Sequence, residues 1–159
     1  MKTMELKINA LARLCTAEKE SDREAARAEI LRLMQPGAAL SADPEYLIRQ
    51  IMLDLGTPEN LVGHPYMVEA ILLVVEDRAY IDNVTFGLYP QVAAKFDTTA
   101  ARVERAMRHL IEVTWARSDM DTLSRHFGNT VHAWKGKPTN SEFIARIANE
   151  VLLQLRLAS

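Results

Sequence analysis

Apolar residues recur every three or four positions along most of this 159-residue chain, which is the spacing of helices that bury one face. The pattern predicts helices over residues 4–15, 21–34, 44–55, 64–82, 91–96, 99–117, 120–127 and from 140 onward, with a short helical turn at 57–63. No alternating run is long enough to predict a strand. We therefore expect an all-α fold, in which the very apolar helix 64–82 is the central buried one.

Residues at the helix boundaries divide the chain into two parts. Two capping boxes, Ser21–Glu24 and Thr139–Glu142, each predict the start of a helix. A loop rich in small residues, 36–43, is short enough to be a joint rather than a flexible tether. We expect an N-terminal extension of two helices, 1–40, followed by a compact helical domain of about six helices, 44–159.

Composition and charge narrow the function classes. No apolar run approaches the roughly 20 residues of a membrane-spanning helix. The N-terminus lacks the features of a secretion signal, and the single cysteine excludes an internal disulfide framework. We therefore expect a cytoplasmic protein with no membrane partner. The net charge is −2, but residues 85–137 hold 8 Lys and Arg against 5 Asp and Glu, a net of +3, so this region is a candidate surface for a polyanion.

Two predicted helices in this basic region are joined by a very short turn at Asp97-Thr98. Such helices must cross steeply, which requires a small residue where the backbones meet, and Ala93 supplies it. Asp97 tolerates the left-handed backbone that the turn position demands. An apolar set at the right offsets completes the pattern: Val92, Phe96, Val103 and Ala106. The spacing is that of a helix-turn-helix, whose second helix enters the DNA major groove.

The second helix, 99–117, separates into an apolar face and a charged face. At 100° per residue the docking face holds Val103, Ala106, Met107, Leu110, Ile111 and Thr114. The opposite face holds Ala101, Arg102, Glu104, Arg105, Arg108, His109 and Glu112. Thr98 or Thr99 can cap the helix and leave amides free for a phosphate. Alternatively, this is an ordinary solvated face on which the arginines pair with Glu104 and Glu112.

Three blocks in the second part of the chain resemble one known family. They are LYPQVAAKF (88–96), TTAARVERAMRHLIEVTW (98–115) and KPTNSEFIA (137–145). From about Pro44 to Ser159 the chain is similar to the C-terminal effector domain of the stage-zero sporulation master regulator of endospore-forming bacteria. The resemblance implies a domain of about six helices that binds double-stranded DNA at a TGTCGAA box, often as a dimer on tandem sites.

The resemblance assigns roles to residues of the second helix. It implies that Glu104 and Arg105 read base edges, because Arg can donate two hydrogen bonds to guanine and Glu can accept from cytosine. Arg108 and His109, one turn later, would reach bases or backbone. The expected phosphate contacts are Thr98, Thr99, Arg102, Lys135 and Lys137, although the two lysines equally suit a solvated loop.

The resemblance also suggests a partner other than DNA. In the family, the short helix after the recognition helix faces the sigma subunit of RNA polymerase. In this chain that helix is 120–127, and a polymerase-facing surface would include Thr122, Ser124 and Phe127, unless Phe127 belongs to the core. Full-length family members also carry an N-terminal receiver domain. Here only about forty helical residues stand in its place, so we expect no control by phosphorylation of this chain.

We expect neither an enzyme nor a metal or cofactor site. Cys15 lies on an apolar stripe and is interpreted as core rather than nucleophile. His126 and His132 do not have metal-ligand spacing, and there is no glycine-rich loop for a nucleotide. Helices 4–15 and 21–34 would bury their stripes against the domain or in a dimer. An interaction module that binds sigma subunit or a related regulator, with weak or no DNA affinity, is the alternative function.

Overall fold

The computed structural model describes residues 12, 19–34, 43–128 and 136–158. The chain consists of two compact units, Met1–Asp43 and Pro44–Ser159. In the first unit, helix α2 spans Glu20–Met34. It starts earlier than the capping box predicted, because the Lys19 carbonyl accepts hydrogen bonds from the N–H groups of Asp22 and Arg23, both at 3.1 Å. Ser21 therefore lies inside the first turn rather than at the cap. The predicted helix 4–15 and loop 36–43 lie almost entirely outside the described residues.

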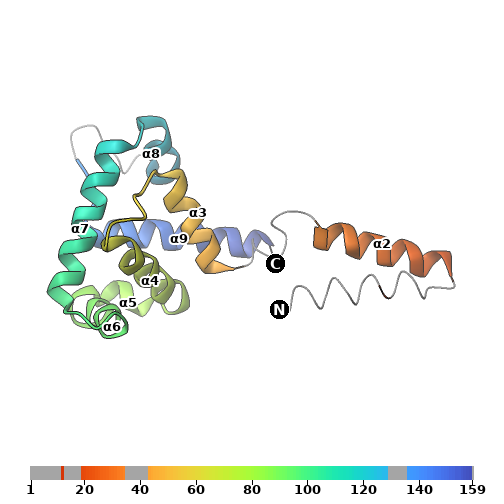
Figure 1. Cartoon of the computed structure of the whole chain (residues 1–159), viewed down its shortest axis with the longest axis horizontal. Coiled ribbons are helices and arrows are strands. Elements are labelled where there is room, and N and C mark those ends of the chain that lie inside the picture. Colours follow the sequence, from red (N-terminus) through yellow and green to blue (C-terminus); the bar gives the residue numbers. More distant parts are fainter. Residues whose placement is uncertain (1–11, 13–18, 35–42, 129–135, 159) are drawn as a thin grey trace. The chain divides into compact units, whose positions relative to one another are not determined.

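The second unit is built from helices (Figure 1). They are α3 (Pro44–Asp54), α4 (Gly63–Glu76), α5 (Ala79–Asp82), the π-helix η1 (Val84–Leu88), α6 (Tyr89–Lys95), α7 (Ala100–Arg117), α8 (Met120–Phe127) and α9 (Asn140–Ala158). The described residues contain no strand, so the predicted all-α fold is confirmed.

Helix α4 is central to this unit, as its apolar sequence predicted. It packs against α3, α7 and α9. Ile71 and Val74 are buried, whereas Leu72 and Val75 on the same helix are only half-buried. Burying one stripe of α4 against three helices removes a large apolar area from water, which is the main stabilising term in a domain of this size.

The region between α3 and α6 differs from the predicted pattern. Residues 57–62 form an irregular loop instead of the predicted helical turn, and α4 starts at Gly63. The helix predicted over 64–82 is also divided, because Asp77 adopts an extended backbone with φ −140° and ψ 109°. The Asp77 carboxylate then accepts a 2.9 Å hydrogen bond from the Ala79 N–H, which starts α5. This local side-chain bond competes with continuation of the helix.

Candidate nucleic-acid interface

Helices α6 and α7 form the predicted helix-turn-helix. Val92 and Ala93 on α6 are buried where the two helices meet. Asp97 has φ +50°, the one positive φ among the described residues that are not glycine. The Thr98 N–H donates a 3.0 Å hydrogen bond to the Ala93 carbonyl, which closes the turn. The left-handed residue therefore lies where the sequence predicted it.

The start of α7 is capped by Thr99 rather than Thr98. Thr99 has an extended backbone, and its hydroxyl accepts a hydrogen bond from the Arg102 N–H at 3.4 Å. This distance is long for a capping bond. The hydroxyl and the positive end of the helix dipole both lie at the exposed start of α7, where a phosphate would be favoured.

The inner face of α7 docks on the domain through residues that its helical pattern predicted. Val103, Met107, Leu110, Ile111 and Thr114 are buried, whereas Ala106, also predicted on this face, is only half-buried. The start of α4 approaches the middle of α7 so closely that a Cβ on Gly63 would lie 2.3 Å from the Ala106 carbonyl oxygen. The sequence marked Gly63 only as a helix end. Its close approach to α7 could not be read from a local pattern.

The outer face of α7 brings together four of the nine predicted DNA-contact residues. A shallow hollow of about 490 Å³ is lined by Arg102, Arg105, Ala106, Arg108, His109 and Glu112. Arg102, Arg105, Arg108 and His109 are exposed. No described carboxylate forms an ion pair with Arg102 or Arg105. The structure thus brings these cationic side chains together on one surface.

Two carboxylates on the same helix pair with cations at the interface. Glu104 forms an ion pair with Arg108 one turn later. Glu112 pairs with Lys137 at 2.5 Å, and the hydrogen bond from this lysine holds the pKa of Glu112 below its ordinary value. Of the arginines on this face, Arg108 therefore pairs with a carboxylate, as expected for an ordinary solvated face. Lys137 lies beside α7, whereas the other predicted lysine, Lys135, is outside the described residues.

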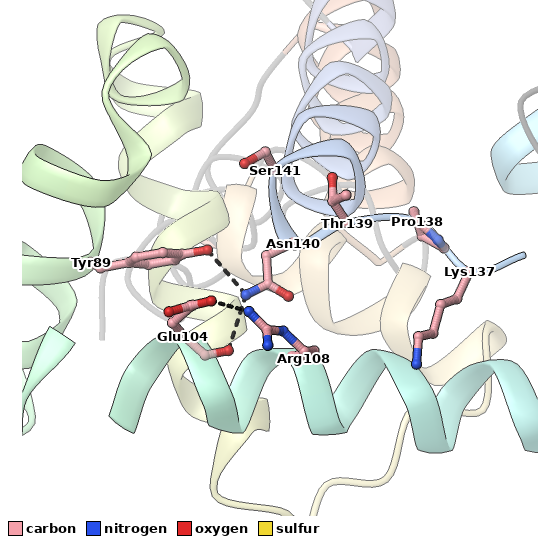
Figure 2. Close-up of a pocket in the computed structure, with 8 residues that line it drawn as sticks. All are labelled: Tyr89, Glu104, Arg108, Lys137, Pro138, Thr139, Asn140 and Ser141. Carbon is pink, nitrogen blue, oxygen red and sulfur yellow. Dashed lines mark hydrogen bonds and ion pairs between the residues drawn. The ribbon is translucent and has the colours of Figure 1, made fainter. Parts of the chain in front are cut away.

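The start of α9 is fixed beside α7 (Figure 2). Thr139 and Glu142 form the predicted capping box: the Thr139 N–H donates to Glu142 at 2.9 Å, and the Glu142 N–H donates to the Thr139 hydroxyl at 3.2 Å. The buried Asn140 amide donates to the Tyr89 hydroxyl and to the Glu104 carbonyl, both at 3.0 Å. The pKa of Tyr89 lies above its ordinary value, because burial raises it by more than the hydrogen bond from Asn140 lowers it. Asn140 thus ties α9 to α6 and α7, a role that the sequence reasoning missed.

These bonds border a hollow of about 300 Å³ next to α7 (Figure 2). It is lined by Tyr89, Glu104, Arg108, Lys137, Pro138, Thr139, Asn140 and Ser141. Its cations, Arg108 and Lys137, are the two that pair with carboxylates of α7. The KPTNSEFIA block therefore positions Lys137 against α7.

The residues of the predicted polymerase-facing surface differ in exposure. Phe127 is buried, with its ring centroid 4.9 Å from Trp115 and 5.5 Å from Phe143. Thr122 is also buried, and its N–H and hydroxyl both donate to Asp119 at 2.9 Å. Ser124 is exposed. Of the three, Ser124 is therefore the side chain available to a partner.

His126 is the other residue whose surroundings the sequence did not reveal. It is buried on α8, between Asp54 at 2.6 Å from its Nε2 and Glu150 at 3.0 Å from its Nδ1. Burial lowers the pKa of His126, but its hydrogen bonds to the carboxylates of Glu150 and Asp54 raise it by more, so the pKa lies above the ordinary 6.5. The described residues contain no group of three ligands suited to a metal ion. His126 therefore links α8 to α3 and α9 electrostatically.

A steep two-helix motif with a left-handed turn, a docked inner face and a cationic outer face defines a helix-turn-helix DNA-binding domain. Residues 48–151 match the family described as Sporulation initiation factor Spo0A C terminal. The chain belongs to this family, which is a family of DNA-binding effector domains in transcription regulation and not of enzymes. No helix among the described residues is long and apolar enough to cross a bilayer.

Proposed function

We propose that this protein binds double-stranded DNA sequence-specifically and regulates transcription, with α7 reading a TGTCGAA-like box from the major groove. The observation that carries this proposal is the exposed cluster of Arg102, Arg105 and His109 on a helix whose opposite face is firmly buried. Arg105 suits guanine, because its planar guanidinium can donate to O6 and N7 together. Glu104 suits the amino group of the neighbouring cytosine.

The Glu104–Arg108 ion pair has to open for both side chains to reach bases. The two side chains are 40% and 61% exposed, so the pair is worth about 0–1 kcal/mol. A good contact to a base edge is worth about 1–3 kcal/mol. Opening the pair therefore costs less than the contact gains.

Phosphate contacts would fix the register of α7 on the duplex. Thr98, Thr99 and Arg102 lie at the start of the helix, where the helix dipole also favours an anion. Lys137 would exchange Glu112 for a phosphate, and Lys135 stays a predicted phosphate contact. These contacts carry no sequence information, so they contribute equally to specific and non-specific binding.

The test is a titration of the full chain with duplexes that contain or lack the box, at several salt concentrations. We expect Arg105→Ala to remove most of the preference, about 1–3 kcal/mol. Arg105→Lys keeps the charge but loses the two-pronged geometry, so it should also lose most of the preference. Arg102→Ala should weaken both duplexes alike and reduce the salt slope by about one.

Arg49→Ala is the matched control, because Arg49 is exposed on α3 and pairs there with Glu45 at 2.8 Å. It removes the same charge outside the helix-turn-helix and should leave both affinities unchanged. Equal affinity for the two duplexes at every salt concentration would refute sequence-specific binding.

An interaction module is the second candidate, favoured by the carboxylates that neutralise Arg108 and Lys137 on the recognition face. It predicts weak binding to both duplexes and measurable binding to the purified sigma subunit of RNA polymerase. Ser124→Arg would place a long cation on the exposed side of α8. If α8 faces the polymerase, this substitution should weaken sigma binding and leave the binding of both duplexes unchanged.

We also propose that residues 1–40 serve packing or dimerisation, and that the signal acting on this domain is not phosphorylation of the chain itself. The apolar stripe of the predicted helix 4–15 supports the first proposal, because such stripes are normally buried. The full chain and one starting near Ser41 should differ in oligomeric state by sedimentation or in stability by urea unfolding, and equality in both would refute this proposal. Acetyl phosphate with Mg²⁺ should leave the box affinity unchanged.

A further inference from the structure

A further cationic hollow lies away from α7, with no residue of α7 in its lining. It has a volume of about 320 Å³ and is lined by Arg78, Arg146, Asn149, Glu150, Leu152, Leu153 and Arg156. Arg78 precedes α5, and the other residues belong to α9. Three arginines therefore converge on one hollow from two elements that pack together.

The arginines of this hollow retain donors for an external anion. The Arg146 Nε donates to the His126 carbonyl, which positions the guanidinium at the hollow. No described carboxylate forms an ion pair with Arg78 or Arg156. The hollow's own carboxylate, Glu150, accepts a hydrogen bond from His126 at 3.0 Å, so its charge is directed into the domain. An acidic ligand would therefore meet an excess of positive charge.

The hollow also offers an apolar surface. Leu153 is 58% exposed, although it lies on a helix whose other face is buried. Leu152 beside it is half-buried. A phosphate backbone gains nothing from leucine, whereas a peptide can place an apolar side chain there while its carboxylates meet the arginines.

The position of the hollow argues against an extension of the DNA surface. Helix α9 meets the recognition helix through Asn140, at its first turn. Arg156 lies sixteen residues further along α9, which is about 24 Å of helix. Figure 1 shows α9 running from α7 toward the other side of the domain.

We propose that this hollow docks an acidic segment of a partner protein, with its carboxylates on Arg78 and Arg156 and an apolar side chain against Leu153. The site goes beyond the proposed DNA-binding function and does not depend on it. An effector domain that holds DNA on α7 and an acidic protein segment on α9 would connect the two.

The probe is a short fluorescent peptide that alternates glutamate and leucine, titrated with the full chain and followed by anisotropy. Two matched peptides replace all glutamates by glutamine or all leucines by serine. We expect the first peptide to bind at least about tenfold more tightly than either control, because each lost charged hydrogen bond or apolar contact weakens binding by about that factor. Equal binding of all three peptides, or no binding, would overturn the proposal.

Paired double variants locate the binding. Arg78→Gln with Arg156→Gln should weaken peptide binding about tenfold or more. Arg102→Gln with Arg105→Gln removes the same charge from α7 and should leave it unchanged. Equal loss in both double variants would show non-specific attraction and overturn the docking site.

A DNA arm separates this proposal from the proposed function. The Arg78 and Arg156 double variant should retain wild-type affinity for the box duplex and the wild-type salt slope. If its DNA affinity and salt slope fall instead, the hollow contacts phosphates and the protein-docking proposal is wrong. All four residues are exposed, so urea unfolding should confirm that both double variants fold normally.

Discussion

The stability of the effector domain should depend on the charge of His126. The buried imidazole has a carboxylate at each ring nitrogen, Asp54 at 2.6 Å and Glu150 at 3.0 Å. When protonated it donates to both, whereas a neutral imidazole has one N–H and can donate to only one. Raising the pH therefore removes one hydrogen bond and the charge that strengthens the other.

The size of this effect follows from the two contacts. A hydrogen bond between charged groups contributes about 1.5–3 kcal/mol, and a neutral one about half as much. The Asp54 side chain is 45% exposed, so water screens its contribution, while Glu150 is 22% exposed. We expect deprotonation of His126 to lower the free energy of unfolding by about 1–2 kcal/mol.

The direction is set by the raised pKa of His126. A group whose pKa is higher in the folded state gives its full stabilisation below the unfolded pKa, here about 6.5. That stabilisation is lost as the pH rises through the folded pKa. His64 acts oppositely, because burial lowers its pKa and its contribution is lost as the pH falls. Comparing the stability of wild type and a His126 variant at the same pH cancels the contribution of His64.

The assay is urea unfolding of wild type and His126→Gln, followed by circular dichroism between about pH 5.5 and 8.5. The stability difference should be largest at the low end and shrink by about 1–2 kcal/mol toward the high end. His109→Gln, which removes an exposed imidazole from α7, should show no such trend. A difference that is constant, or that grows with pH, would refute the charged contacts of His126.

Other substitutions test packing and capping by the same unfolding assay. Gly63→Ala should destabilise by about 1–3 kcal/mol or more, because its Cβ would lie 2.3 Å from the backbone carbonyl of Ala106. Thr139→Ala should cost about 0.5–2 kcal/mol through loss of the α9 cap. Phe127→Ala should cost about 3–5 kcal/mol, because its ring is enclosed by aromatic neighbours. Ser124→Ala, three residues earlier and exposed, should be neutral within about 0.5 kcal/mol.

Much of the DNA-binding motif could be predicted from the sequence because its signals are local. The left-handed turn at Asp97, the cap at Thr99 and the buried stripe of α7 depend on residues within a few positions of one another. The helical period then separates the docking face from the charged face. The cations on that face are exposed, and their DNA contacts stay a prediction.

Other features depend on residues distant in the sequence, and the local pattern was silent or misleading there. Gly63 looked like a helix end, but its contact partner is Ala106, 43 positions later. His126 looked like an isolated histidine, but the fold places Asp54 and Glu150 against it. Asn140 looked like part of a cap, but its amide also bonds Tyr89.

The sequence by itself determined the helical class, most helix boundaries and the outward charge of α7, because backbone hydrogen bonding and side-chain period act over a few residues. The Glu104–Arg108 pair is local, because its partners are four residues apart on one helix. Only the tertiary structure decided which charges distant in the sequence meet. Lys137 meets Glu112, and Arg78 joins two arginines of α9 at one hollow, because helix packing sets which side chains come within reach. Electrostatic interactions depend on distance in space. The sequence pattern therefore could not show which charges distant in the sequence interact.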